Sequence, residues 1–241
     1  MAIPIIATPT YELTVPSTKK VIKYRPFLVK EEKLLLLAME SKDAKQIQST
    51  SKEVIKNCTF GEIDVEISPP FDIEYILLQL RIRSVGEKVN TRLKCQKCET
   101  SNAVEIDLQS INVTNPDNHN NTIKLTDTMG VVMKYPSLGN EELFSMREED
   151  KENAVKSAEM SMKMICSCIE AIFDGDKVYQ AKNFSKTEVM EFVENLSQVM
   201  FQKLISFFQN MPAIKHDVNL KCEKCGYENE YTLRGIQDFF T

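Results

Sequence analysis

The feature that most constrains the fold is a short cysteine motif that occurs twice. The chain contains LKCQKC at residues 93–98 and LKCEKC at residues 220–225, and the two copies differ at one position. We call each C-x-x-C motif a knuckle. One knuckle offers two thiolates, whereas a tetrahedral zinc site needs four ligands. The repeat therefore predicts that the two knuckles meet in the folded protein.

Apolar and polar residues alternate on both sides of each knuckle. Val89, Thr91 and Leu93 precede the first knuckle, and Val104, Ile106 and Leu108 follow it; residues 214–233 repeat this layout around the second. Alternation of this kind is typical of half-buried strands. Each knuckle is therefore predicted to be the turn of a β-hairpin.

We expect one structural zinc ion to be shared by the two knuckles. Its predicted ligands are Cys95, Cys98, Cys222 and Cys225. The two halves of a zinc ribbon are commonly about 15 to 20 residues apart, whereas more than a hundred residues separate these knuckles. The sequence thus predicts a split zinc ribbon with an insertion between its halves.

Other interpretations of the knuckles remain open at this point. The cysteines could be reduced structural thiols without metal, or one knuckle could be redox-active, although such motifs usually begin a helix. A catalytic zinc usually has three protein ligands, often including histidine. The chain has two histidines; His216 could be a spare ligand, and we expect His119, in an Asn-rich loop, to be exposed.

The charge of the chain limits the partners we expect. Lys94, Lys97, Lys221 and Lys224 surround the knuckles, and we interpret them as charge compensation for a four-thiolate zinc site. The net charge of −5 and the isoelectric point near 5.3 argue against a nucleic-acid or anionic-membrane surface. Long apolar runs and a signal-peptide pattern are absent, so we expect a soluble protein.

The pattern along the chain predicts an α+β fold. We expect an extended arm over 1–29, a mixed α+β region with the first knuckle over 30–138, a helical insert over 139–212, and a segment over 213–241 whose knuckle closes the same domain. Pro4, Pro9, Pro16 and Pro26 favour an extended arm or edge strands.

Individual elements follow from periodicity and from stop signals. The sequence predicts one or two helices over 30–58, a strand over 61–70, a helix over 71–86 and two short strands over 122–137. It further predicts a helical region from 140 to 173 and a helix from a capping box at Ser185 and Glu188 to Pro212. Cys166 and Cys168, in a Met-rich run, are expected to pack in a core.

The sequence offers no recognisable catalytic apparatus. It lacks the P-loop, the dinucleotide-binding glycine motif and the G-x-S-x-G motif, and it has only 7 glycines. We therefore expect neither an enzyme nor a small-molecule substrate. An enzyme with a cysteine nucleophile would need a partner base, and the sequence shows none. The rival hypothesis is a different class of protein, a zinc-ribbon regulator that binds nucleic acid.

The order of these features resembles a known family. A Pro-rich segment, IPIIATPTYELTVPSTKKVIKYRPFLVKEEKLLLLAMES (3–41), leads into mixed strands, the split knuckles and the helical insert. This order is similar to that of the baseplate-hub assembly proteins of T-even-type contractile-tailed phages, and YRPFLVKEEKLLLLAMES (24–41) is its most specific part.

The resemblance implies a non-enzymatic role late in infection, in virion assembly. It implies that the partners are other baseplate hub proteins and that the protein acts in the host cytoplasm during tail assembly; residence in the virion baseplate stays open. It carries over no catalytic residue. We expect the segment 3–27 to contact a partner through backbone hydrogen bonds.

Overall fold

The chain forms two compact units, which are described separately. The computed structural model describes residues 7–41, 43–114, 119–137 and 154–234. Unit 1 combines Met1–Pro116 with Ala213–Thr241, and unit 2 is Asp117–Pro212. Unit 1 is therefore built from two separate parts of the chain.

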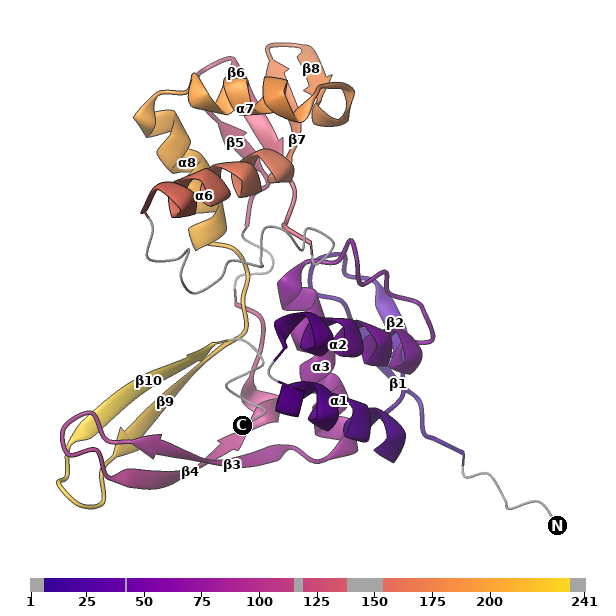
Figure 1. Ribbon diagram of the computed structural model, residues 1–241, viewed down its shortest axis with the longest axis vertical. Coiled ribbons are helices and arrows are strands. Elements are labelled where there is room, and N and C mark those ends of the chain that lie inside the picture. The colour runs from indigo at the N-terminus through magenta and orange to yellow at the C-terminus, as the bar shows by residue number, and fades with distance from the viewer. Residues whose placement is uncertain (1–6, 42, 115–118, 138–153, 235–241) are drawn as a thin grey trace. The chain divides into compact units, whose positions relative to one another are not determined.

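Unit 1 contains helices and small antiparallel sheets (Figure 1). Its helices are α1 (Val29–Ser41), α2 (Ala44–Cys58) and α3 (Pro70–Ser84). Its strands form three hairpins, β1 (Tyr11–Thr14) with β2 (Val21–Tyr24), β3 (Lys88–Lys94) with β4 (Ser101–Asp107), and β9 (Lys215–Lys221) with β10 (Glu228–Arg234). A 3-10 turn, η1 (Leu108–Ser110), follows β4.

Helix α3 is the most buried helix of unit 1. Pro70 occupies its first turn, where the missing N–H costs nothing, and the helix ends before Gly86, which has a φ of 131°. Buried side chains surround its axis, so α3 can carry core contacts on several faces.

The N-terminal segment is a packed hairpin from Tyr11 onward, and the predicted alternative of edge strands is the one observed there. Leu13, Ile22 and Tyr24 are buried. The backbone N–H of Ser17 donates to Asp72 Oδ1 at 3.0 Å, and the Ser17 hydroxyl donates to Asp72 Oδ2. The second of the two predicted alternatives, edge strands, therefore describes this hairpin, and residues 1–6 lie outside the described residues.

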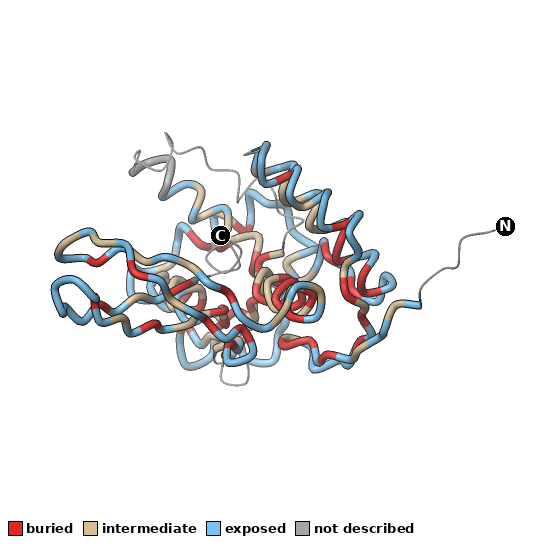
Figure 2. Tube along the Cα trace, turned by 90° about the horizontal axis from the view of Figure 1, so that it is seen from below, coloured by how far each residue is buried: buried red, intermediate tan, exposed pale blue. Residues whose placement is uncertain are grey.

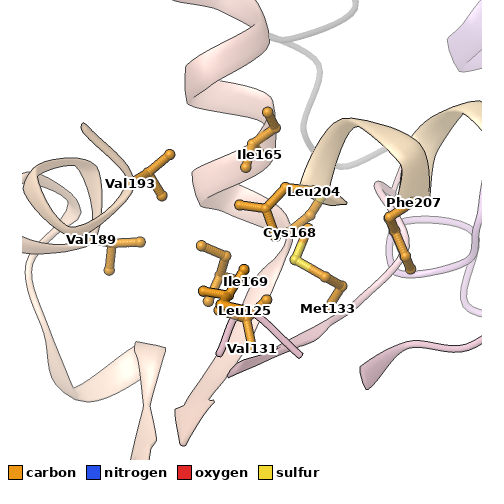
Figure 3. Close-up of a cluster of buried hydrophobic side chains, with 10 residues drawn as sticks. All are labelled: Leu125, Val131, Met133, Ile165, Cys168, Ile169, Val189, Val193, Leu204 and Phe207. Carbon is orange, nitrogen blue, oxygen red and sulfur yellow. The ribbon is translucent and has the colours of Figure 1, made fainter. Parts of the chain in front are cut away.

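Unit 2 is a four-stranded antiparallel sheet with helices. The strand order is β5–β6–β7–β8. The strands are β5 (Thr122–Lys124), β6 (Met129–Met133), β7 (Ile169–Asp174) and β8 (Lys177–Gln180); the helices are α6 (Ala154–Cys168), α7 (Lys186–Glu194) and α8 (Gln198–Gln209), with a 3-10 turn η2 (Ala181–Asn183). Figure 3 shows its core, which side chains from the sheet region and from α6, α7 and α8 form.

The α+β class predicted from the sequence is confirmed, but three predicted elements are wrong. Residues 61–70 form turns up to the start of α3. The helical region expected to reach 173 stops at Cys168, and the chain continues as β7. The single helix expected after Ser185 is two helices, because Ser197 caps a new one. The four-part domain division stays a prediction.

Candidate metal centre

Two hairpins from separate parts of the chain carry the knuckles. Both pack on α3 in one core, and Figure 1 shows their knuckle ends side by side. The buried side chains of this core are Leu78, Ile82, Val89, Ile106, Leu108, Ile111, Ile214, Val218 and Leu233. Apolar packing along the hairpins therefore aligns the two knuckles at their tips.

The two knuckles have the same backbone geometry. In the first, the Cys95 N–H donates to Thr100 O and the Glu99 N–H donates to Cys95 O, both at 2.9 Å; the second knuckle repeats these bonds at matching positions, at 2.8 and 2.9 Å. Glu99 and Gly226, which follow the second cysteine, have φ values of 57° and 69°. The sequence repeat is therefore also a structural repeat.

The four thiols converge. Their sulfur atoms all lie within 4.8 Å of one another. Cys95 Sγ is 3.6 Å from Cys225 Sγ, and Cys98 Sγ is 3.6 Å from Cys222 Sγ. A tetrahedron with Zn–S bonds of about 2.3 Å has edges of about 3.8 Å. The four cysteines could therefore hold one metal ion, and both short distances run between the knuckles.

The first cysteine of each knuckle is more buried than the second. Cys95 and Cys222 are 1% and 2% exposed, whereas Cys98 is half-buried and Cys225 is exposed. The Lys97 N–H points to Cys95 Sγ at 3.4 Å. Backbone N–H groups of this kind stabilise the charge of a coordinating thiolate.

Hydrogen bonds give the thiols of the two knuckles different acidities. The hydroxyl and backbone N–H of Thr100 lower the pKa of Cys98 to about 6. The Tyr227 N–H acts to lower the pKa of Cys225, but desolvation and the three neighbouring sulfurs raise it to about 12. A divalent cation would remove this repulsion and favour four thiolates.

The shape of the site fits a structural role. Four cysteines fill a tetrahedral shell and leave no position for a substrate or a water. His216, the possible spare ligand, lies in β9 opposite Leu233 and is not in the four-cysteine group. Each knuckle leads into a strand and not a helix, so it lacks the helix dipole that activates redox cysteines.

His119 was expected to be exposed, and this expectation is wrong. It is half-buried in unit 2, with Nδ1 at 3.0 Å from the Tyr135 hydroxyl and Nε2 at 2.7 Å from Phe207 O. A polar loop composition does not show which of its side chains turns inward. Both ring nitrogens have protein partners, so the hydrogen bonds of His119 are explained by its packing in unit 2.

The surface around the knuckles carries balanced charge. Five cations are exposed there, and so are four glutamates within the same two segments: Arg92, Lys94, Lys97, Lys221 and Lys224, with Glu99, Glu223, Glu228 and Glu230. Phosphate recognition needs a net positive surface. The charge pattern therefore does not favour a nucleic-acid contact here.

The three other cysteines have core surroundings. Cys58 and Cys168 are fully buried, and Cys166 is half-buried beside the unit 2 core. Burial raises the pKa of Cys58 and of Cys166 to about 11. These thiols are protonated at neutral pH, in agreement with the packing role predicted for Cys166 and Cys168.

Sequence reasoning missed two asparagines at this site. Asn102 and Asn229 each lie four residues after the second cysteine of a knuckle, and both are buried between exposed neighbours. Figure 2 shows how buried and exposed stretches alternate along the chain. The signal was visible, because the repeat extends to ten residues, LKCQKCETSN and LKCEKCGYEN.

Comparisons with known proteins give the family. Within the described residues, no helix has the length and apolar character that a membrane span requires. No solved structure matches the chain significantly. The chain is 26% identical over 238 residues to the baseplate hub assembly protein gp26 of Enterobacteria phage T4, which covers 95% of this chain and 97% of that protein. A family model described as T4 bacteriophage base plate protein matches residues 8–241. The chain therefore belongs to the T4 bacteriophage base plate protein family.

Proposed function

We propose that the protein is a non-enzymatic assembly protein of the phage tail baseplate hub, stabilised by one structural zinc ion. The observation that carries this proposal is the match to the T4 baseplate hub assembly protein, which spans nearly the whole length of both chains. The alignment covers 95% of this chain and 97% of that protein, which supports a shared role.

The four-cysteine group supports zinc as the ion. Thiolate ligands select soft or borderline metals, and tetrahedral S4 sites hold zinc or iron. Zinc has no redox chemistry and suits a site whose task is to hold two hairpins together. Zinc coordinated by Cys95, Cys98, Cys222 and Cys225 would cross-link the two sequence segments that make up unit 1.

The mechanism we propose is binding without turnover. Its partners are other baseplate hub proteins, met in the host cytoplasm while the tail is assembled. The segment 3–27 remains a candidate contact, since β1 and β2 form a two-stranded sheet and each has one edge that pairs with no described strand. Free strand edges accept an extended segment of a partner.

Co-purification with elemental analysis tests both parts of the proposal. The full chain, carrying an affinity tag, is recovered from infected cells with and without nuclease treatment. We expect nuclease-resistant recovery of baseplate hub proteins and about one zinc per chain. Recovery that depends on DNA would favour the zinc-ribbon regulator, and iron or no metal would contradict the zinc assignment.

A single substitution tests the shared site. Cys98→Ser should abolish stoichiometric zinc and lower the thermal midpoint of unit 1 by ten degrees or more as an order of magnitude, because structural zinc binding is coupled to folding. Cys166→Ser, outside the group, is the matched control and should keep about one zinc. Equal zinc content in the two variants would refute the shared site.

A further inference from the structure

The asparagine that completes each ten-residue repeat is buried where its neighbours are not. Asn102 is 2% exposed and Asn229 is 1% exposed. The residues on both sides of each, such as Ser101 and Glu230, are exposed. A buried amide needs hydrogen-bond partners for both its oxygen and its nitrogen. The positions of those partners indicate what the two asparagines do.

The amide oxygens cross from one hairpin to the other. The Gln96 N–H in the first knuckle donates to Asn229 Oδ1 at 2.8 Å. The Glu223 N–H in the second knuckle donates to Asn102 Oδ1 at 3.1 Å. Gln96 and Glu223 occupy the same position, directly after the first cysteine of a knuckle. Each hairpin therefore holds the ligand loop of the other.

The amide nitrogens donate to backbone carbonyls of their own hairpins. Asn102 Nδ2 donates to Thr100 O at 2.8 Å. Asn229 Nδ2 donates to Tyr227 O at 3.1 Å and to Leu220 O at 3.2 Å. The amide nitrogen of each asparagine thus bonds to its own hairpin, while the amide oxygen bonds to the other hairpin. Asparagine suits this task because it has a donor and an acceptor on one short, planar group.

We propose that Asn102 and Asn229 form a reciprocal latch that holds the two knuckles face to face before the metal binds. The latch consists of the two crossed bonds, and the asparagines are positioning residues for the four cysteines. This inference rests on the metal site proposed above. It adds that the protein itself, and not the ion alone, brings the two pairs of thiols together.

The distance of the knuckles from the shared core is the physical reason for a latch. The core and the bridge between Val113 and Ile214 join the two hairpins at their base, whereas the crossed bonds join them at the knuckles. An ion that had to order two separately moving knuckles would lose affinity through the conformational entropy of ordering them. Partners outside the coordination shell that orient the ligands typically raise metal affinity 10- to 100-fold.

A local role for the asparagines predicts a different result. If each side chain served only the turn of its own hairpin, its removal would disturb the knuckle on the same hairpin. The latch predicts the opposite, because loss of Asn229 would free the amide of Gln96 and loss of Asn102 would free that of Glu223. This crossed pattern separates the two roles.

Amide exchange in the metal-free protein measures the pattern directly. The reduced full chain is treated with a chelator, and exchange at Gln96 and Glu223 is followed by NMR in the parent, Asn102→Leu and Asn229→Leu, since leucine has a similar shape without polar atoms. We expect about tenfold faster exchange at Gln96 in Asn229→Leu alone and at Glu223 in Asn102→Leu alone. Acceleration confined to the knuckle of the substituted hairpin, without the crossed effect, would overturn the latch.

Exposed asparagines of the same hairpins serve as controls. Asn90 in β3 and Asn219 in β9 are exposed, and Asn90→Leu and Asn219→Leu should leave both amides as they are in the parent. Should a latch variant fail to fold, the parent still decides the matter. Exchange at Gln96 and Glu223 in the metal-free parent as fast as in an unstructured peptide would overturn the proposal.

Zinc affinity supplies an independent readout. In competition with a chromophoric chelator, each latch variant should bind zinc about tenfold more weakly than the parent, and the two controls should not. A parent that binds no zinc but shows the crossed exchange pattern would sink the metal proposal and keep the latch. If the parent binds zinc and all variants match it in zinc affinity and in amide exchange, the metal proposal holds and the latch is wrong.

Discussion

At the scale of single residues, the two knuckles have the same backbone conformation but differ in its conformational strain. The position after the second cysteine is left-handed in both, with Glu99 at a φ of 57° and Gly226 at 69°. Glycine adopts this region without a steric penalty, whereas a residue with a Cβ pays about 1 kcal/mol. The first knuckle therefore carries strain that the second avoids.

We expect opposite effects from two substitutions at this position. Gly226→Ala should lower the free energy of unfolding by about 1 kcal/mol, and Glu99→Gly should raise it by a similar amount. A Cβ on Gly226 meets no atom within 4 Å, so the effect is conformational. Denaturant titration of the metal-loaded protein measures both. Glu87→Gly, where φ is not positive, is the control and should not stabilise.

A buried ion pair fixes the start of α1. The Glu31 side chain is 2% exposed and accepts hydrogen bonds from Arg25 Nη2 at 2.7 Å and from the Leu28 N–H at 2.6 Å. Burial acts to raise the pKa of Glu31, but these bonds outweigh it and hold that pKa below its ordinary value. Arg25 also contacts Cys58, since its N–H donates to Cys58 O at 2.9 Å.

Glu31→Gln should destabilise the protein in a pH-dependent way. Leaving Arg25 without its charge partner should cost about 3 kcal/mol at pH 7. The pKa of Glu31 is lower in the folded than in the unfolded state, so its contribution is present above about pH 4.5 and is lost as the pH falls further. The difference between parent and variant should therefore shrink between about pH 5 and pH 3 in denaturant titrations.

The neighbouring residue supplies the control for this prediction. Glu32 is exposed, so Glu32→Gln should change the free energy of unfolding by less than about 0.5 kcal/mol at any pH. A Glu31→Gln variant that matches Glu32→Gln would show that the ion pair contributes nothing.

At the scale of elements, periodicity predicted the type of secondary structure well for long segments with a regular pattern. It predicted that type poorly for short segments whose structure depends on a pairing partner. The predictions for α3 and for both knuckle hairpins hold. The run IEAIFD (169–174) is short and apolar and suits a helix or a strand equally well. It is a strand because β6 and β8 pair with its two edges. β8 follows it directly, but β6 (Met129–Met133) lies far upstream in the chain.

Helix α1 exposes an unusual number of apolar side chains. Its exposed members are Val29 at 81%, Leu36 at 57%, Leu37 at 50%, Leu34 at 45% and Met39 at 40%. Contiguous exposed apolar side chains mark protein–protein contacts, so we take Leu36 and Leu37, which are neighbours in the sequence, as the candidate contact on α1. Within the proposed function, the partner would be a baseplate hub protein.

We expect Leu36→Glu combined with Leu37→Glu to abolish recovery of hub proteins while the protein stays folded. Both side chains are about half exposed, so the free energy of unfolding should change by less than about 1 kcal/mol. Gln46→Glu combined with Ser49→Glu adds the same charge to exposed positions of α2 and should keep recovery intact. Unchanged recovery with the α1 variant would exclude this helix as the contact.

At the scale of the whole molecule, unit 2 is inserted where the two segments of unit 1 pair. Val113 and Ile214 form an antiparallel bridge, and the Thr114 N–H donates to Ala213 O at 2.9 Å. Residues bridged in this way have Cα atoms about 5 Å apart. The point where the chain leaves unit 1 is therefore adjacent to the point where it returns.

Replacement of 117–212 by a short Gly/Ser linker should leave unit 1 folded. Four residues can span the gap, because adjacent Cα atoms are about 3.8 Å apart. We expect the shortened chain to unfold in one cooperative step and to bind about one zinc. The same chain with Cys98→Ser is the control and should lack zinc. Failure of the shortened chain to fold would show that unit 1 depends on unit 2.

The sequence by itself determined the local features of this protein. Spacing and alternation within each copy of LKC-x-KC predicted two hairpins with paired thiols, because a knuckle and its strands are set by near neighbours. The repeat also predicted that the knuckles meet, and the four sulfurs do lie together. Only the tertiary structure decided that Asn102 and Asn229 cross between the copies. Those contacts join residues more than a hundred positions apart, and they depend on how both hairpins pack on α3, which no local pattern encodes.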